Sequence, residues 1–77
     1  MQKLEHPRQL QIAGRNIQCD TADDRTLLMQ AGSIEVDPSV AATLSVGRLQ
    51  LIKDACQRYS VGKHQRLVNQ AIERSGR

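Results

Sequence analysis

A near-repeat in the second half of the sequence constrains the fold more than any other feature. Residues 45–50 (SVGRLQ) are echoed by residues 60–65 (SVGKHQ), and an amphipathic segment follows each copy. Apolar side chains recur in both segments at the spacing of one helix face. Each copy therefore predicts a polar start and a short helix, and the two copies together predict a helical hairpin joined by a tight turn.

The inward faces of the two predicted helices are mainly aliphatic. The first face comprises Leu49, Ile52, Ala55, Cys56 and Tyr59, and the second comprises Leu67, Val68, Ala71 and Ile72. We expect Tyr59 to lie at the corner of the helical hairpin with its hydroxyl in water. His64 falls at the edge of the second face, where a packed or half-exposed side chain is expected.

Alternation of apolar and polar residues predicts a β-hairpin within residues 9–20. Leu10 and Ile12 alternate with polar neighbours, as do Ile17 and Cys19, and a turn containing Gly and Asn separates the two runs. An isolated hairpin is only marginally stable, so its apolar face should pack on the helices. The polar residues 1–8 predict a frayed terminus.

Capping signals predict the next helix, over residues 21–32. Thr21 is a candidate N-cap, Asp24 follows three residues later, and Gly32 is a natural stop. Residues 33–36 alternate in polarity and are also compatible with a short strand.

A helical region is predicted over residues 38–74. Asp37 and Pro38 suit an N-cap and a first helical position. Two alternatives remain for residues 38–59: either Gly47 separates two helices, or one helix continues through it.

The chain has to build its core without large aromatic rings. Its 77 residues include one Tyr and no Phe or Trp, and a domain of this size has a thin margin of stability. We therefore expect a single small α+β domain, with an N-terminal β-hairpin packed on short helices, that gains stability as a homodimer or from a partner. Cys19 and Cys56 should be buried, reduced thiols, with a disulfide as the alternative.

Charge is distributed unevenly along the chain. Residues 1–47 carry four basic and six acidic side chains, whereas residues 48–77 carry seven basic and two acidic ones. A basic half predicts an anionic partner, because opposite charge attracts. The outward faces of the predicted helical hairpin hold side chains that can contact phosphates or base edges, namely Lys63, Arg66, Asn69, Gln70 and Arg74, with Arg48, Lys53 and Arg58 flanking them.

These features predict a small DNA-binding regulatory protein of a bacterial, plasmid or phage kind, acting in transcription regulation. Lys63, Arg66 and Arg74 would hold phosphate or guanine, and Asn69 and Gln70 would read base edges. The alternative is a protein–protein interaction module, such as a small inhibitor, adaptor or chaperone-like protein, that docks on an acidic partner surface.

Motifs for other classes are missing from the sequence. It contains no Gly-rich phosphate loop, no nucleophile elbow, no HExxH and no cluster with metal-ligand spacing, so we expect neither enzyme activity nor a cofactor or metal. It also has no 18-residue apolar run and no apolar leader near Met1, so we expect no membrane partner and a cytoplasmic location.

One family resemblance adds to this interpretation. Residues 40–46 (VAATLSV), the two predicted helices and residues 67–73 (LVNQAIE) resemble ribbon-helix-helix repressors and antitoxins. The resemblance spans residues 40–74. It implies a dimer in which a strand from each copy pairs with its twin and enters the major groove of DNA. We transfer no site residues from that family.

Overall fold

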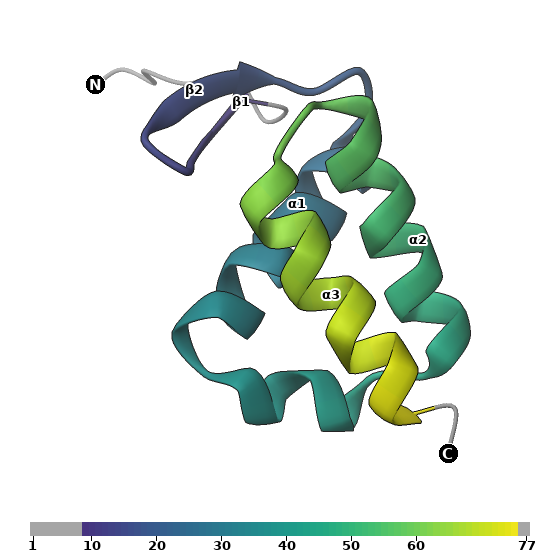
Figure 1. The fold of residues 1–77 in the computed structure, drawn as a ribbon. Helices are drawn as coiled ribbons and strands as arrows, with labels where there is room; N and C mark the ends of the chain where they lie inside the picture. Colours follow the sequence, from purple (N-terminus) through teal and green to yellow (C-terminus); the bar gives the residue numbers. More distant parts are fainter. Residues whose placement is uncertain (1–8, 76–77) are drawn as a thin grey trace.

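The predicted α+β class, with a β-hairpin followed by helices, is confirmed (Figure 1). The computed structural model describes residues 9–75, so the expectation for residues 1–8 lies outside the described part. Within that part the elements, in chain order, are β1 (Gln9–Ile12), β2 (Arg15–Gln18), α1 (Ala22–Val36), a 3-10 helix η1 (Pro38–Thr43), α2 (Val46–Arg58) and α3 (Gly62–Ser75). The three α-helices pack on one another, and α2 and α3 form the predicted helical hairpin.

The β-hairpin is tighter than the sequence suggests. β1 and β2 pair antiparallel with Leu10 opposite Ile17. Only Ala13 and Gly14 form the turn, and both have positive φ, 54° and 74°. Such a pair of left-handed residues matches the right-handed twist of the strands. The apolar face of the hairpin packs on α1 as expected, and it buries Ile12, Ile17 and Cys19.

Helix α1 begins as predicted and ends later than predicted. The Thr21 hydroxyl accepts the Asp24 amide hydrogen at 3.0 Å, which caps the helix. The predicted stop at Gly32 is wrong, as is the strand alternative for residues 33–36, because α1 continues to Val36. A helical glycine costs only about 1 kcal/mol. Burial of Ile34, which is 2 % exposed, contributes about 2 kcal/mol and outweighs it.

Residues 38–58 form two separate helices. Asp37 caps η1 as predicted, with its Oδ1 accepting the Ser39 amide hydrogen at 3.1 Å. Leu44 is then extended, so the alternative of one continuous helix is wrong. The break was expected at Gly47, but it falls at Leu44 and Ser45, and Gly47 lies inside α2. Helix α2 starts anew after Ser45, whose hydroxyl accepts the Arg48 amide hydrogen at 3.1 Å.

The two copies of the near-repeat serve opposite ends of a helix. Ser45 caps the start of α2, whereas Ser60 lies just past its end with φ at 60°. The amides of Ser60 and Val61 donate to the carbonyls of Gln57 and Cys56 at 3.2 and 2.8 Å. This is the hydrogen-bond pattern of a Schellman motif, in which glycine usually occupies the left-handed position.

The core is aliphatic and runs through the hairpin and the helices. Both cysteines are free and buried, which confirms the expectation of reduced thiols. The inward face predicted for α2 is buried except at Tyr59, which is half-buried. On α3, Val68 and Ala71 are buried while Leu67 and Ile72 are half-buried. The largest fully buried side chains are Leu28, Leu49, Ile52, His64, Val61, Val68, Cys19 and Cys56.

Replacing Ser60 with glycine should raise the free energy of unfolding by about 1 kcal/mol, because glycine adopts positive φ without a steric penalty. Chemical denaturation measures the change. Ser33→Gly is the matched control: Ser33 lies within α1, so there the same substitution should lower stability. A loss of stability in Ser60→Gly would contradict this account of the turn.

Candidate nucleic-acid interface

The outward face of α3 carries a line of basic and amide side chains. Lys63, Arg66, Gln70 and Arg74 are spaced i, i+3, i+7 and i+11, which places them on one side of a helix, and all four are exposed. We call these four residues the α3 stripe. It extends for about 16 Å along the helix axis. Figure 1 shows α3 running along the surface, with α1 behind it and α2 at its side.

Packing of the opposite side of α3 sets this orientation. His64, Val68 and Ala71 are buried at spacings of four and three residues, so they turn the α3 stripe away from the core. Asn69, the remaining candidate on this helix, is exposed beside the stripe, one turn from the carboxylate of Glu73. The helix therefore brings four of its five predicted contact residues into one line.

Two of the predicted flanking residues lie elsewhere. The Arg58 Nη2 contacts the Asp24 Oδ1 at 2.6 Å, and the Arg48 Nε donates to the Gln30 Oε1 at 2.8 Å. Both partners belong to α1, so Arg48 and Arg58 lie where α2 faces α1 and do not extend the α3 stripe. Lys53 is half-buried on α2.

Asp24 organises the junction between α1 and α2. Besides the Arg58 contact, its Oδ2 accepts the Tyr59 hydroxyl hydrogen at 2.7 Å, and the hydroxyl oxygen accepts the Asp20 amide hydrogen at 2.7 Å. The hydroxyl was expected to reach water, and the structure adds these two hydrogen bonds within the protein. Burial raises the pKa of Tyr59 to about 12; the Asp24 carboxylate acts in the same direction, and the Asp20 amide opposes it.

The β-hairpin is tied to the turn that precedes α3. The Arg15 Nη2 donates to the carbonyls of Tyr59 and Ser60 at 3.2 and 3.0 Å. A cation at these carbonyls is favourable, because the C-terminal end of a helix carries partial negative charge. Arg15 thus helps to fix the position of the turn and, through it, the start of α3.

The start of α3 is also held by an acidic side chain from the end of α1. The Lys63 Nζ contacts the Glu35 Oε2 at 2.6 Å, and the His64 Nε2 donates to the Glu35 Oε1 at 2.7 Å. Within residues 9–75 His64 is the only buried polar residue, at 1 % exposure, and its Nδ1 has no hydrogen-bond partner there. The hydrogen bond from Lys63 lowers the pKa of the Glu35 carboxyl, and His64 adds to the effect.

These contacts separate the cations of the α3 stripe into two kinds. Lys63 is already paired with Glu35. Arg66 and Arg74 have no acidic partner in the described part of the chain, although both are exposed. Sequence reasoning missed the pairing because its two members lie far apart in the chain. The one feature of the sequence that could have indicated a buried polar contact at this position is His64, a polar side chain beside an apolar helix face.

The described residues offer neither a reactive cysteine nor a metal-ion site. Burial raises the pKa of the Cys56 thiol to about 11 and raises that of Cys19, which opposes formation of the reactive thiolate. Residues 9–75 hold no group of His, Cys, Asp or Glu placed to bind a metal ion. Nor does this part contain a helix long and apolar enough to span a membrane.

An ultraviolet absorbance titration can follow Tyr59 alone, because it is the only tyrosine and the chain has no tryptophan. The phenol of the folded protein should ionise near pH 12 and not near the ordinary value of 10. Asp24→Asn should move ionisation to lower pH, because it removes the neighbouring negative charge. Ionisation near pH 10 with the native circular dichroism intact would contradict the assigned contacts.

The Glu35 pairing should appear in the pH dependence of stability. The folded-state pKa of Glu35 lies below its ordinary value of 4.5, so its contribution is present above that pH and is lost as pH falls through the folded-state value. Glu35→Gln should therefore remove part of the acid sensitivity measured by denaturation. Glu73→Gln, which neutralises an exposed carboxylate on α3, should leave it in place. Equal acid sensitivity in wild type and Glu35→Gln would argue against the pairing.

Comparison with protein-family models, curated proteins and solved structures finds no match for this chain. The resemblance to ribbon-helix-helix proteins stays a prediction. In this structure the residues that would supply their strand belong to η1, the two-residue connection after it and the start of α2. The proposed function therefore rests on the α3 stripe.

Proposed function

We propose that this protein binds duplex DNA through the α3 stripe, as a small regulatory protein. The observation that carries the proposal is a line of exposed polar side chains on one helix, in which Arg66 and Arg74 have no acidic partner among residues 9–75. Arginine is well suited to such a role, because its planar fork binds phosphate or the edge of guanine with two hydrogen bonds.

The dimensions of α3 suit the major groove. The groove is about 12 Å wide and admits an α-helix. Arg66 and Arg74 are eight residues apart, which is about 12 Å along the helix axis. When α3 lies across the groove, the two guanidinium groups can reach phosphates near its opposite edges, while Gln70 between them faces the bases and can pair with adenine.

The charge of the surrounding helices supports this orientation. Helices α2 and α3 together carry six basic and two acidic side chains, whereas α1 carries one basic and three acidic ones. This separation would turn the α2–α3 side toward a polyanion and would raise the association rate. The same separation suits an acidic protein surface, so direct measurement with DNA has to separate the two partners.

The test is binding to a random-sequence duplex at low and moderate salt by fluorescence anisotropy. Wild type should bind at low salt and lose affinity as salt rises, because phosphate contacts release counterions. Arg66→Gln with Arg74→Gln should weaken binding at least about tenfold and reduce the log–log salt slope by about 2. Each replacement keeps a polar side chain on an exposed site, so the fold should persist.

The matched control is Arg48→Gln with Arg58→Gln, which removes the same charge from the side of α2 that faces α1. This variant should keep most of the affinity and the wild-type salt slope. Equal losses in both double variants would show that total charge, and not the α3 stripe, governs binding. If wild type does not bind at low salt, the proposal fails, and docking on an acidic protein becomes the leading function.

A further inference from the structure

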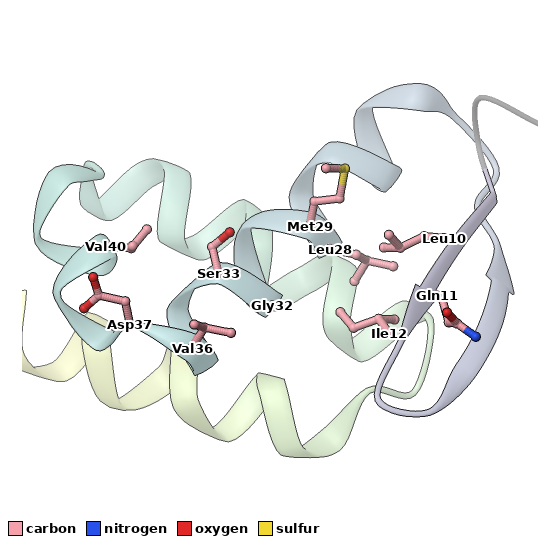
Figure 2. Close-up of a pocket in the computed structure, with 10 residues that line it drawn as sticks. All are labelled: Leu10, Gln11, Ile12, Leu28, Met29, Gly32, Ser33, Val36, Asp37 and Val40. Atoms are coloured by element: carbon pink, nitrogen blue, oxygen red, sulfur yellow. The ribbon is translucent and has the colours of Figure 1, made fainter.

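An apolar groove of about 480 Å³ lies between β1, α1 and η1, away from the α3 stripe. Figure 2 shows its lining, with Leu10 and Met29 toward one end and Asp37 and Val40 toward the other. Leu28, Gly32 and Val36 of α1 lie between these ends, together with Ile12 of β1. None of the lining residues belongs to α3, so an occupant of the groove would leave the stripe free.

Two side chains of the groove are apolar and unusually exposed. Val36 is 86 % exposed and Met29 is 44 % exposed, and both line the groove. They are seven residues apart on α1, so they lie on one side of that helix about 10 Å apart. Apolar side chains clustered around a concave surface mark an interaction site more often than scattered ones do.

Gly32 lies between these two side chains without an internal packing reason. A Cβ added there would meet the Ile12 Cδ1 at 3.8 Å, an ordinary contact, so alanine would fit this protein. Glycine weakens a helix interior, yet it allows another backbone to approach closely. Ser33, the next residue, is also small and is exposed. The centre of the α1 surface is therefore open to a second helix.

The two ends of the groove carry opposite charge. At one end Arg25 contacts Met29, with its Nη1 3.0 Å from the sulfur. At the other end Asp37 lines the groove. Neither forms an ion pair with another residue in the part of the chain that the structure describes. A surface that is positive at one end and negative at the other is complementary to itself when reversed.

We propose that this groove is a homodimer interface in which the α1 helices of two copies pack antiparallel across Gly32 and Ser33. A two-fold axis between these residues places Met29 against the partner's Val36, since their positions are symmetric about it. About the same axis Asp37 comes opposite the partner's Leu28, three residues or about 4.5 Å along the helix from Arg25, a separation that the Arg25 side chain can bridge. Each copy buries the apolar surface that the other leaves exposed, and the charged ends meet in pairs of opposite sign.

Analytical ultracentrifugation of the full chain over a range of concentrations tests the proposal. Wild type should sediment as a reversible dimer. Val36→Glu should weaken self-association at least about tenfold, because it brings an unpaired carboxylate into an apolar interface. Leu51→Glu is the matched control: Leu51 is 51 % exposed on α2, outside the groove, so this variant should remain dimeric.

Gly32→Ala provides a second variant that should fold at least as well as wild type. It should raise the thermal midpoint of the monomer, because alanine favours the helix, and weaken the dimer, because the added methyl group separates the two helices. A monomeric wild type would overturn the proposal and leave the groove for a different protein. A dimer unaffected by Val36→Glu, or abolished by Leu51→Glu, would also overturn it.

Discussion

Two carboxylates of α1 hold the helical hairpin against that helix. Asp24, in the first turn, binds Arg58 and Tyr59 at the end of α2, and Glu35, near the last turn, binds Lys63 and His64 at the start of α3. The helical hairpin is therefore attached to α1 at both ends of that helix. In a core without Phe or Trp, these polar contacts add the directional constraint that aliphatic packing lacks.

The same contacts decide which charges are available to a partner. The basic residues of the C-terminal half are not equally available to a partner, because Arg58 and Lys63 have carboxylate partners within the chain. Arg66 and Arg74 do not, among the residues that the structure describes, and they share one helix face with Gln70. A surface for a polyanion on α3 and an apolar groove on α1 then occupy different sides of one small protein.

Local signals in the sequence predicted most of the fold. The Thr21 and Asp37 caps, the alternation in the β-hairpin and the amphipathic spacing of α2 and α3 act within a few residues of one another. The predictions missed features that depend on contacts between residues far apart in the chain. Burial of Ile34 carries α1 past its glycine, and the Tyr59 hydroxyl finds a carboxylate 35 positions away. The spacing of residues in the sequence predicted that the α3 stripe lies on one helix face. Only the structure showed that Arg48 and Arg58 lie elsewhere, against α1.

Amide chemical shifts of isotopically labelled protein, recorded as a short DNA duplex is added, would test the assignment of surfaces most directly. The largest changes should lie along α3, at Lys63, Arg66, Gln70 and Arg74, and they should diminish as salt is added. The signals of Met29, Gly32 and Val36 should not respond to DNA. Changes centred on α1, or spread evenly over the molecule, would contradict this assignment.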